Sequence, residues 1–398
     1  MLNENEPTKQ SEPEPETFQE IENWTDLNIG ENLLRGIYNN GFDTPSPIQK
    51  KAIAPIIAGR DVVAQAQSGT GKTATFSIGA LSCVDMSFNE TQVLIISPTK
   101  ELTLQTANVV KLLGGTMNGL EVELMYGGIS ENRDFFSKRK NPHIVCGCPG
   151  KLLDQMNRRK LDASKLKLVI MDEVDEMLTG GFNEQIYDIF QHLNSKVQVA
   201  LFSATMPTEI RNVVNKIVQN PVEILVKSEM LSLAGIQQFY VAVNNDKQKY
   251  DVLKDIFTYL TVSQCIIYCN SVSRVCYLYE DMMADNFPVS CIHGNMTKDE
   301  REQAFMNFKN GKSRVLLSTN ITARGIDIQQ VSVVINFDIP TSIDNYLHRI
   351  GRSGRWGRKG VGINLITKRD VTQLKNIEKH YGREINEMPS DLKFLNNS

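Results

Sequence analysis

Residues 66–73 carry the residue types that hold phosphate groups. This glycine-rich segment lies between an apolar stretch at 61–64 and a predicted helix over 73–83. Glycines let backbone N–H groups converge on one anion, and the dipole of the helix adds positive potential there. Lys72 supplies a cation for the β- and γ-phosphates, and the Thr73 hydroxyl is a ligand for Mg²⁺. The predicted nucleotide cradle comprises Gln67, Ser68, Gly69, Thr70, Gly71, Lys72 and Thr73.

An acidic segment, Asp172 to Asp175, follows the apolar residues 169–171. Asp172, at the end of a predicted strand, suits Mg²⁺, and the adjacent Glu173 suits a general base that activates water. The alternative is a solvated charge cluster at a strand end. Because the order and spacing of the two segments fit nucleotide chemistry, we predict a site that binds and hydrolyses a nucleoside triphosphate.

Four further residues among the first 226 are candidates for this site. The amide of Gln49 donates and accepts, as the edge of adenine requires, and Trp24 offers a ring for stacking. The alternatives are a surface glutamine and a half-buried aromatic residue. Ser203 and Thr205 follow an apolar stretch, and either relay between the phosphate site and a neighbouring domain or cap a helix.

A basic segment at 348–355 contains three arginines and two glycines. One interpretation is a solvated basic loop. The other is that Arg352 and Arg355 reach across a cleft between domains and neutralise charge that develops on the γ-phosphate. Arginine suits this role because its planar guanidinium holds two oxygens at once.

Alternating strands and helices must position these segments. Short apolar stretches alternate with helical patterns over most of the 398 residues, which is typical of parallel sheets with helices on both faces. We predict two α/β domains, at 24–226 and 237–398, joined by a linker at 227–236. The glycine-rich segment then follows an early strand, at the edge of the sheet where such folds bind ligands.

Charge is distributed unevenly along the chain. Residues 1–22 carry seven Glu and one Lys, a net charge of −6, so the remainder of a chain with net charge −3 carries +3. We predict a disordered acidic tail at 1–23. The mildly basic body allows a local groove for RNA but excludes a strongly cationic surface.

Composition excludes several other classes of protein. No apolar run approaches the length of a membrane span, and the N-terminus lacks a charged-then-apolar signal segment, so we expect no membrane association and a place in the cytosol or nucleus. The seven cysteines form no CxxC pair and accompany no histidine cluster. Reduced thiols are therefore favoured over zinc sites or disulfides.

The order of the segments resembles the DEAD-box RNA helicases of superfamily 2, over residues 24–395. Besides the segments above, the resemblance rests on 41–49 (Q motif), 98–102 (motif Ia), the Gly127-Gly128 pair, 148–151 (motif Ib), 203–205 (motif III), 267–270 (motif IV) and the His293-Gly294 turn. It implies two tandem RecA-like domains, each a parallel sheet with helices on both faces, with ATP and Mg²⁺ as cofactors.

The resemblance also implies a division of labour among residues. Catalysis falls to Lys72, Asp172, Glu173, Arg352 and Arg355, while Gly325 and Asp327 complete the nucleotide site. RNA contacts fall to Pro98, Thr99, Lys100, Gly127, Gly128, Pro149, Gly150, Lys151, Thr319 and Arg324. Coupling between the domains falls to Asp175, Ser203, Thr205 and His348. The implied cycle closes the cleft on ATP and RNA, bends one strand of a short duplex without reading its sequence, and reopens after hydrolysis.

Within the family, the chain most resembles translation initiation factor 4A and its nuclear exon-junction paralogue. Residues 33–38 and 387–389 are typical of both, 329–332 favour the translation factor, and the form of 352–355 favours the nuclear one. The resemblance implies a monomeric helicase of translation initiation in the cytoplasm, held by a scaffold protein that bridges both domains. The alternative is an ATP-locked RNA clamp of the exon-junction or pre-rRNA-processing type, in the nucleus.

Two more distant alternatives are weaker. One is a superfamily 2 motor on DNA, against which Gln49 and the Gly127-Gly128 pair argue. The other is a catalytically inactive paralogue, against which the intact lysine, carboxylates and arginines of the predicted site argue.

Several positions depart from the family pattern. They are Val174 for Ala, Lys100 and Lys151 for Arg, Cys148 for Thr, and Asn320 for Asp. The lysines keep the charge but lose the bidentate fork, and the thiol is a weak donor. Because the phosphate-binding residues are retained, we predict a competent ATPase that holds RNA less tightly than the family norm.

Overall fold

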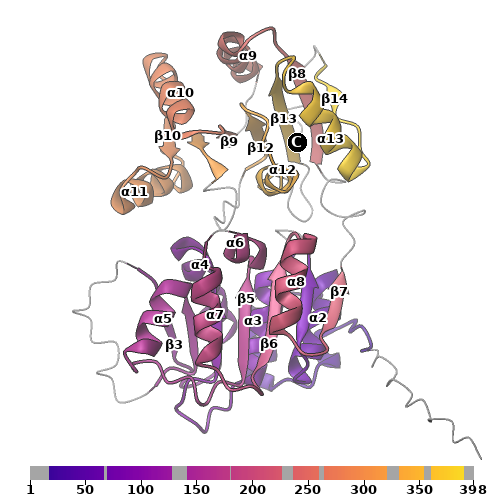
Figure 1. The fold of residues 1–398 in the computed structure, drawn as a ribbon, viewed down its shortest axis with the longest axis vertical. Helices are drawn as coiled ribbons and strands as arrows, with labels where there is room; N and C mark the ends of the chain where they lie inside the picture. The colour runs from indigo at the N-terminus through magenta and orange to yellow at the C-terminus, as the bar shows by residue number, and fades with distance from the viewer. Residues whose placement is uncertain are drawn as a thin grey trace, which may run out of the picture.

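The computed structural model describes residues 18–66, 70–127, 141–179, 181–225, 236–259, 264–320, 331–353 and 360–389. Two α/β domains form this part of the chain, each a parallel sheet with helices on both faces (Figure 1). The predicted fold class is therefore confirmed. Among the described residues, no helix is long and apolar enough to cross a membrane.

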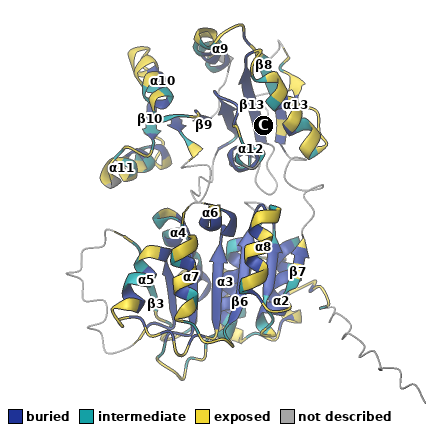
Figure 2. Cartoon of the chain, in the orientation of Figure 1, coloured by how far each residue is buried: buried dark blue, intermediate teal, exposed yellow. Residues whose placement is uncertain are grey.

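Seven described strands form the first sheet, in the order β3-β4-β2-β5-β6-β1-β7. They are β1 (Val62–Gln65), β2 (Val93–Ile96), β3 (Val122–Met125), β4 (Ile144–Gly147), β5 (Leu168–Asp172), β6 (Gln198–Ser203) and β7 (Val222–Leu225). Their central strands are buried along their whole length, because helices cover both faces of the sheet (Figure 2). The apolar stretches seen in the sequence are these central strands.

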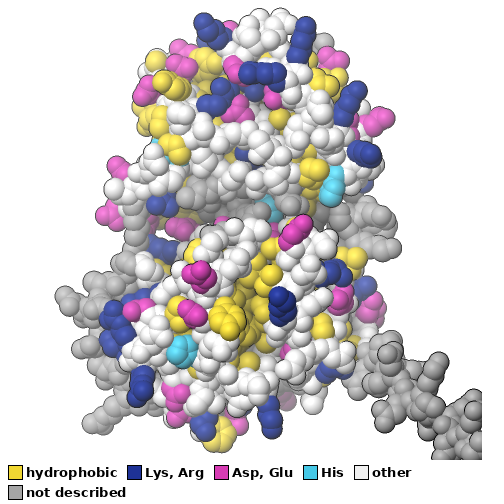
Figure 3. All heavy atoms as spheres, in the orientation of Figure 1, with side chains coloured by type: hydrophobic (Ala, Val, Ile, Leu, Met, Phe, Trp, Pro, Cys, Tyr) yellow, Lys and Arg dark blue, Asp and Glu magenta, His cyan; other side chains and the backbone are white. Residues whose placement is uncertain are grey.

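Helices cover the two faces of the first sheet in separate groups. One core packs under η1 (Trp24–Asp26), α1 (Glu31–Asn39), α2 (Pro47–Ile57), α3 (Lys72–Cys83) and α4 (Lys100–Leu113). The opposite core packs under α5 (Pro149–Asn157), α6 (Val174–Thr179), α7 (Asn183–Gln191) and α8 (Thr208–Ile217). Figure 3 shows charged side chains of both signs spread over this side of the molecule, with hydrophobic side chains gathered over the α7–α8 region.

The second sheet also has seven described strands, in the order β10-β11-β9-β12-β13-β8-β14. They are β8 (Ile236–Ala242), β9 (Cys265–Tyr268), β10 (Val289–Ile292), β11 (Val315–Ser318), β12 (Val333–Asn336), β13 (Gly360–Ile366) and β14 (Asn386–Glu387). The helices are α9 (Asp246–Tyr259), α10 (Val272–Ala284), α11 (Lys298–Lys309), α12 (Ile343–Ile350) and α13 (Val371–Tyr381). All pairings in both sheets are parallel, as the crossover helices require.

The carboxyl ends of the first sheet face the second domain (Figure 1). Contacts that join the domains include His348 with Asp175 and Lys100 with Glu302. The first involves α6, which directly follows β5, and the second involves the first residue of α4. The edge of the sheet that carries the predicted chemistry is thus the edge that meets the second domain.

Two predicted boundaries need correction. Residues 18–23 are not part of a tail, because Ile21 is buried against the first domain and donates its N–H to the Lys50 carbonyl. Glu20 and Glu22 pair with lysines of α2. Ile236, assigned to the linker, begins β8. The rest of the predicted tail and linker, 1–17 and 227–235, lies outside the described residues.

Candidate nucleotide and RNA site

Gly71 shows how the glycine-rich segment is shaped. It has a φ of +98°, and a Cβ there would lie 2.9 Å from Nε2 of Gln49. Only glycine avoids both the strained backbone and the clash. Lys72 and Thr73 then begin α3, so their side chains and the positive end of the helix dipole act on the same anion. Gln67, Ser68 and Gly69 lie outside the described residues, whereas Thr70 accepts a hydrogen bond from Ser46 at its carbonyl.

A buried charge cluster lies beside this segment. Lys72 Nζ is 3.5 Å from Glu173 Oε1, and both side chains are about 5% exposed. Asp172, the last residue of β5, accepts the N–H of Glu173 at 3.0 Å. Glu173 has a φ of +54°, a left-handed conformation that is uncommon for a residue with a side chain. Strain of this kind is typical of positions whose geometry serves a site.

The cluster is electrostatically incomplete. Lys72 Nζ and Glu173 Oε2 are buried without a hydrogen-bond partner among the described residues. Burial, together with the negative charge of Glu173, raises the pKa of the Asp172 carboxyl to about 7. Such orphaned donors and acceptors indicate a ligand that carries both negative charge and a cation. A Mg²⁺-bound phosphate chain has these properties.

Gln49 and Trp24 have different outcomes. Gln49 is buried against the glycine-rich segment and accepts the Ser46 N–H at 2.6 Å, so it is not a surface residue. Trp24 has no exposed surface, and its Nε1 donates to the Phe42 carbonyl at 2.8 Å. A ring buried on all sides offers no face to a base, so the predicted stacking of Trp24 on adenine is contradicted. Trp24 anchors η1 in the core.

The four predicted coupling residues lie together at the junction of the domains. Ser203 Oγ donates to the Thr205 carbonyl at 2.7 Å, and Thr205 Oγ1 donates to Asp175 Oδ2 at 2.5 Å. The same carboxylate oxygen is 3.4 Å from Nε2 of His348 in α12. All four side chains are buried. The structure therefore links the strand end of β6 to the second domain through one carboxylate.

The predicted arginines fall partly within the described chain. Arg352 lies just beyond α12 and is only 6% exposed, so the solvated-loop interpretation does not fit it. Its backbone N–H donates to the Arg349 carbonyl at 3.2 Å. Arg355, Gly325 and Asp327 lie outside the described residues.

Several of the predicted RNA-contacting residues also lie at the carboxyl edge of the first sheet, in the segments that follow β2, β3 and β4. Thr99 caps α4 by accepting the Leu102 N–H at 3.3 Å, and Pro98 precedes it. Lys100 lies 5.3 Å from the Tyr126 ring centre and 3.2 Å from Glu302 of the second domain. Glycine 127 is exposed, with open space where a side chain would lie, while Gly128 and Arg324 fall outside the described chain.

Motif Ib starts α5, where Cys148 is the N-cap residue without a side-chain cap bond. Its thiol instead lies 3.3 Å from Thr103 Oγ1. Pro149 and Gly150 form the first turn, and Lys151 is 3.5 Å from Asp154. Thr319 is half-buried after β11, next to Asn320.

Sequence reasoning missed a polar centre at the carboxyl edge of the second sheet. Lys249 is 2% exposed and donates to the Phe337 carbonyl at 2.8 Å. Asp338 pairs with Lys249 and Arg274, and Arg349 is buried among four hydrogen-bond acceptors. Arg349 stood inside a recognised motif, but nothing in its spacing distinguished a buried arginine from the exposed ones.

Comparisons with known proteins agree with this geometry. Residues 46–213 match the DEAD/DEAH box helicase family, and residues 248–357 match the helicase conserved C-terminal domain. The chain is 50% identical to the ATP-dependent RNA helicase FAL1 of Candida albicans, over 92% of each chain. It is 48% identical to eukaryotic initiation factor 4A of Caenorhabditis elegans, over 94% of this chain and 93% of that one. Among solved structures, Dbp5 of S. cerevisiae bound to RNA and ADP BeF3 has a TM-score of 0.86 at 34% identity, covering 93% of this chain and 96% of that chain.

Proposed function

Because this chain belongs to the DEAD/DEAH box helicase family and is an ATP-dependent RNA helicase, we propose that it unwinds short duplexes in messenger RNA during translation initiation. The similarity to initiation factor 4A supports the assignment to translation. The observation that carries the mechanism is the contact between His348 and Asp175, because it joins the second domain to the segment that holds Asp172 and Glu173.

Mg²⁺ fits the buried cluster. This ion prefers one or two carboxylates plus phosphate oxygens and water, so it needs no group of three protein ligands, and the described residues hold no such group. Asp172 and the Thr73 hydroxyl would hold it, and the ion would stabilise charge on the phosphates. Lys72 would bind the β- and γ-phosphates, and Glu173 would accept the proton of the attacking water.

RNA binding is proposed at the edge formed by the loops after β2, β4 and β11. Helix N-termini at Thr99 and Pro149 present backbone N–H groups, which suit phosphate oxygens rather than bases. Contacts of this kind make binding independent of sequence. We also propose that the chain acts as a monomer in the cytoplasm, and that a scaffold protein bridges its domains. Seven free thiols agree with a reducing compartment.

An unwinding assay tests the proposal. A short RNA duplex with a fluorophore and quencher, mixed with the chain and ATP, should separate, whereas a DNA duplex of the same sequence should not. Replacing ATP by a non-hydrolysable analogue is the control for turnover. Stable ATP-dependent retention of RNA with negligible hydrolysis would instead favour the clamp, and strand separation of DNA would contradict the choice of substrate.

A further inference from the structure

Arg349 has an enclosed side chain within the basic segment at 348–355. It lies on α12 with no exposed surface. Its Nε donates to Asn320 Oδ1 at 2.7 Å, and its Nη2 donates to Asn270 Oδ1 at 2.7 Å. Its Nη1 donates to Asn336 Oδ1 at 3.2 Å and to the Asp338 carbonyl at 2.8 Å. The guanidinium therefore donates hydrogen bonds to residues at the carboxyl ends of β9, β11 and β12.

These four acceptors are all neutral. Desolvation lowers the pKa of Arg349 to about 10, and the side chain stays protonated at neutral pH. The Tyr268 ring centre, 5.3 Å from the guanidinium carbon, adds a cation–π contact. A buried cation without a paired carboxylate costs stability, so a purely structural role would be served better by an apolar residue. Its planar fork is the property that an apolar residue lacks.

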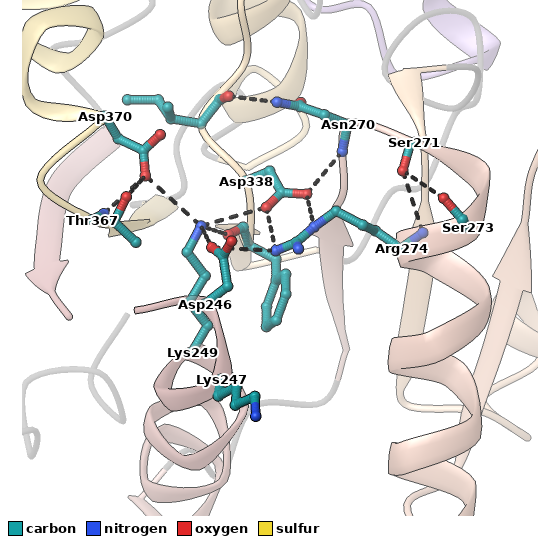
Figure 4. Close-up of polar contacts among 12 residues, drawn as sticks. Asp246, Lys247, Lys249, Asn270, Ser271, Ser273, Arg274, Asp338, Thr367 and Asp370 are labelled. Carbon is teal, nitrogen blue, oxygen red and sulfur yellow. Dashed lines mark hydrogen bonds and ion pairs between the residues drawn. The ribbon is translucent and has the colours of Figure 1, made fainter. Parts of the chain in front are cut away.

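A second group of charged residues packs next to the acceptors of Arg349. The Asp338 carboxylate lies 2.7 Å from Arg274 and 3.4 Å from Lys249 (Figure 4). Asn270 joins the two groups, because its backbone N–H donates to Asp338 Oδ2 at 3.1 Å while its side-chain oxygen accepts from Arg349. Asn270 Nδ2 is in turn held by the Ile339 carbonyl at 2.8 Å. Asn270 and Asp338, which supply two of the four acceptors, are thus themselves held in place.

Arg349 is covalently adjacent to His348 and three residues before Arg352. His348 makes the contact with Asp175 of the first domain. The N–H of Arg352 donates to the carbonyl of Arg349, so the turn that presents Arg352 starts from this residue. A displacement of Arg349 would therefore move His348, which contacts the first domain, and Arg352, which is predicted to reach the γ-phosphate.

We propose that Arg349 is a positioning residue for ATP hydrolysis, held by Asn270, Asn320 and Asn336 so that His348 reaches Asp175 and Arg352 faces the γ-phosphate. The proposal rests on the ATP hydrolysis described under the proposed function. It also gives Asn320 a role in catalysis rather than in RNA binding. Lys72 and Thr73, which would hold the phosphates, lie in the first domain, so a displaced Arg349 should lower turnover more than nucleotide affinity.

Two variants test the positioning role. Arg349→Lys keeps the charge but loses the fork, and Asn270→Ala removes one acceptor of the guanidinium and the side-chain hydrogen bond to the Ile339 carbonyl. Each should lower kcat of RNA-stimulated ATP hydrolysis by about 10²-fold, as expected for a misplaced catalytic group, with KM for ATP unchanged within about twofold. Asn270→Ala keeps the test available if Arg349→Lys does not fold.

Ser290→Ala is the matched control. Ser290 is a buried residue of β10 in the same domain, and its hydroxyl donates to Ser313 Oγ at 2.9 Å, a bond that shares no partner with Arg349. This variant should lower the thermal midpoint as Asn270→Ala does, yet keep kcat within about twofold. Equal losses of kcat in both variants, or unchanged kcat in Arg349→Lys and Asn270→Ala, would overturn the positioning role. A wild-type chain that does not hydrolyse ATP would instead contradict the proposed function.

Discussion

Buried charged groups lie at the carboxyl edges of both sheets, but they differ in how many hydrogen bonds they make. At the first edge, Lys72 Nζ and Glu173 Oε2 are buried without hydrogen-bond partners in the described chain, and Glu173 adopts a strained backbone. At the second edge, Lys249 and Arg349 are equally buried but make two and four hydrogen bonds respectively.

The difference separates a binding site from a support. Unpaired buried groups cost free energy, and they persist where a ligand completes them. The hydrogen bonds around Lys249 and Arg349 form a network that is rigid and holds its neighbours in place, although Arg274 Nη2 at the same edge lacks a hydrogen-bond partner among the described residues. In the proposed mechanism, the first edge binds the nucleotide, and the second edge fixes the groups that act on it. Substitutions at the first edge should impair chemistry while leaving the free chain stable, and the reverse should hold for the charged residues around Asp338 at the second.

Arg352→Ala should give the largest effect. Losing an arginine that neutralises charge on the γ-phosphate should lower kcat for RNA-stimulated ATP hydrolysis on the order of 10³-fold or more. Steady-state kinetics measure it, with Arg369→Ala, an exposed arginine of the same domain, as the charge control. A loss below about tenfold would place Arg352 outside the transition state.

Glu173→Gln should lower turnover on the order of 10³-fold, because the variant keeps the shape of the side chain and loses the base. ATP and RNA should remain bound together, since neither binding group is altered. Retention of labelled RNA on a filter in the presence of ATP detects the trapped complex. Near-normal turnover in this variant would exclude Glu173 as the base.

Asp338→Asn should destabilise the second domain by about 3 kcal/mol, because it leaves Lys249 and Arg274 without their closest carboxylate. Urea unfolding of the full chain, followed through the transition of the second domain, measures the change. The exposed pair of Arg211 and Glu223 provides the comparison, and Glu223→Gln should cost less than about 1 kcal/mol. Similar costs for both variants would remove the distinction between the two edges.

Asp172→Asn should stabilise the nucleotide-free chain at neutral and higher pH. The pKa of Asp172 is raised from 3.8 to about 7 in the folded state, so between these values the folded chain binds more protons than the unfolded chain. Folding stability contributed by this group therefore falls as pH rises from about 4 to 7. Thermal midpoints at about pH 5 and pH 8 should differ less in the variant than in the wild type. Parallel curves would show that burial does not penalise this carboxylate.

The smallest effect is expected from restoring the family residues at two positions. Cys148→Thr together with Asn320→Asp should strengthen RNA binding, by about threefold if one hydrogen bond is gained. Because Asn320 contacts Arg349, the single variant Cys148→Thr should carry most of the gain. Fluorescence anisotropy with single-stranded RNA measures both. Unchanged affinity in the double variant would mean that these departures do not weaken RNA binding.

The sequence was most informative where a signal is local. The segment at 66–73, the carboxylates after β5 and the alternation of strands and helices each depend on near neighbours in the chain, and the two-domain fold followed from them. Trp24 was misassigned because stacking and core burial need the same residue type, and only packing separates them.

The hydrogen-bond acceptors around Arg349 could not be predicted from the sequence, for a different reason. They lie at positions 270, 320, 336 and 338, and asparagine at each strand end resembles an ordinary loop residue. Only the parallel register of β9, β11 and β12 brings them around one guanidinium. Likewise, Ile21 and two glutamates within an acidic stretch gave no sign that they pack on α2.

Steady-state ATP hydrolysis by the full chain, with no nucleic acid, with single-stranded RNA and with single-stranded DNA, tests the central claim most directly. The two edges form one catalytic site only when the domains meet, and RNA bound across both domains favours that arrangement. We predict slow hydrolysis alone and strong stimulation by RNA but not by DNA. Hydrolysis that is equally fast without RNA, or equally stimulated by DNA, would contradict the account.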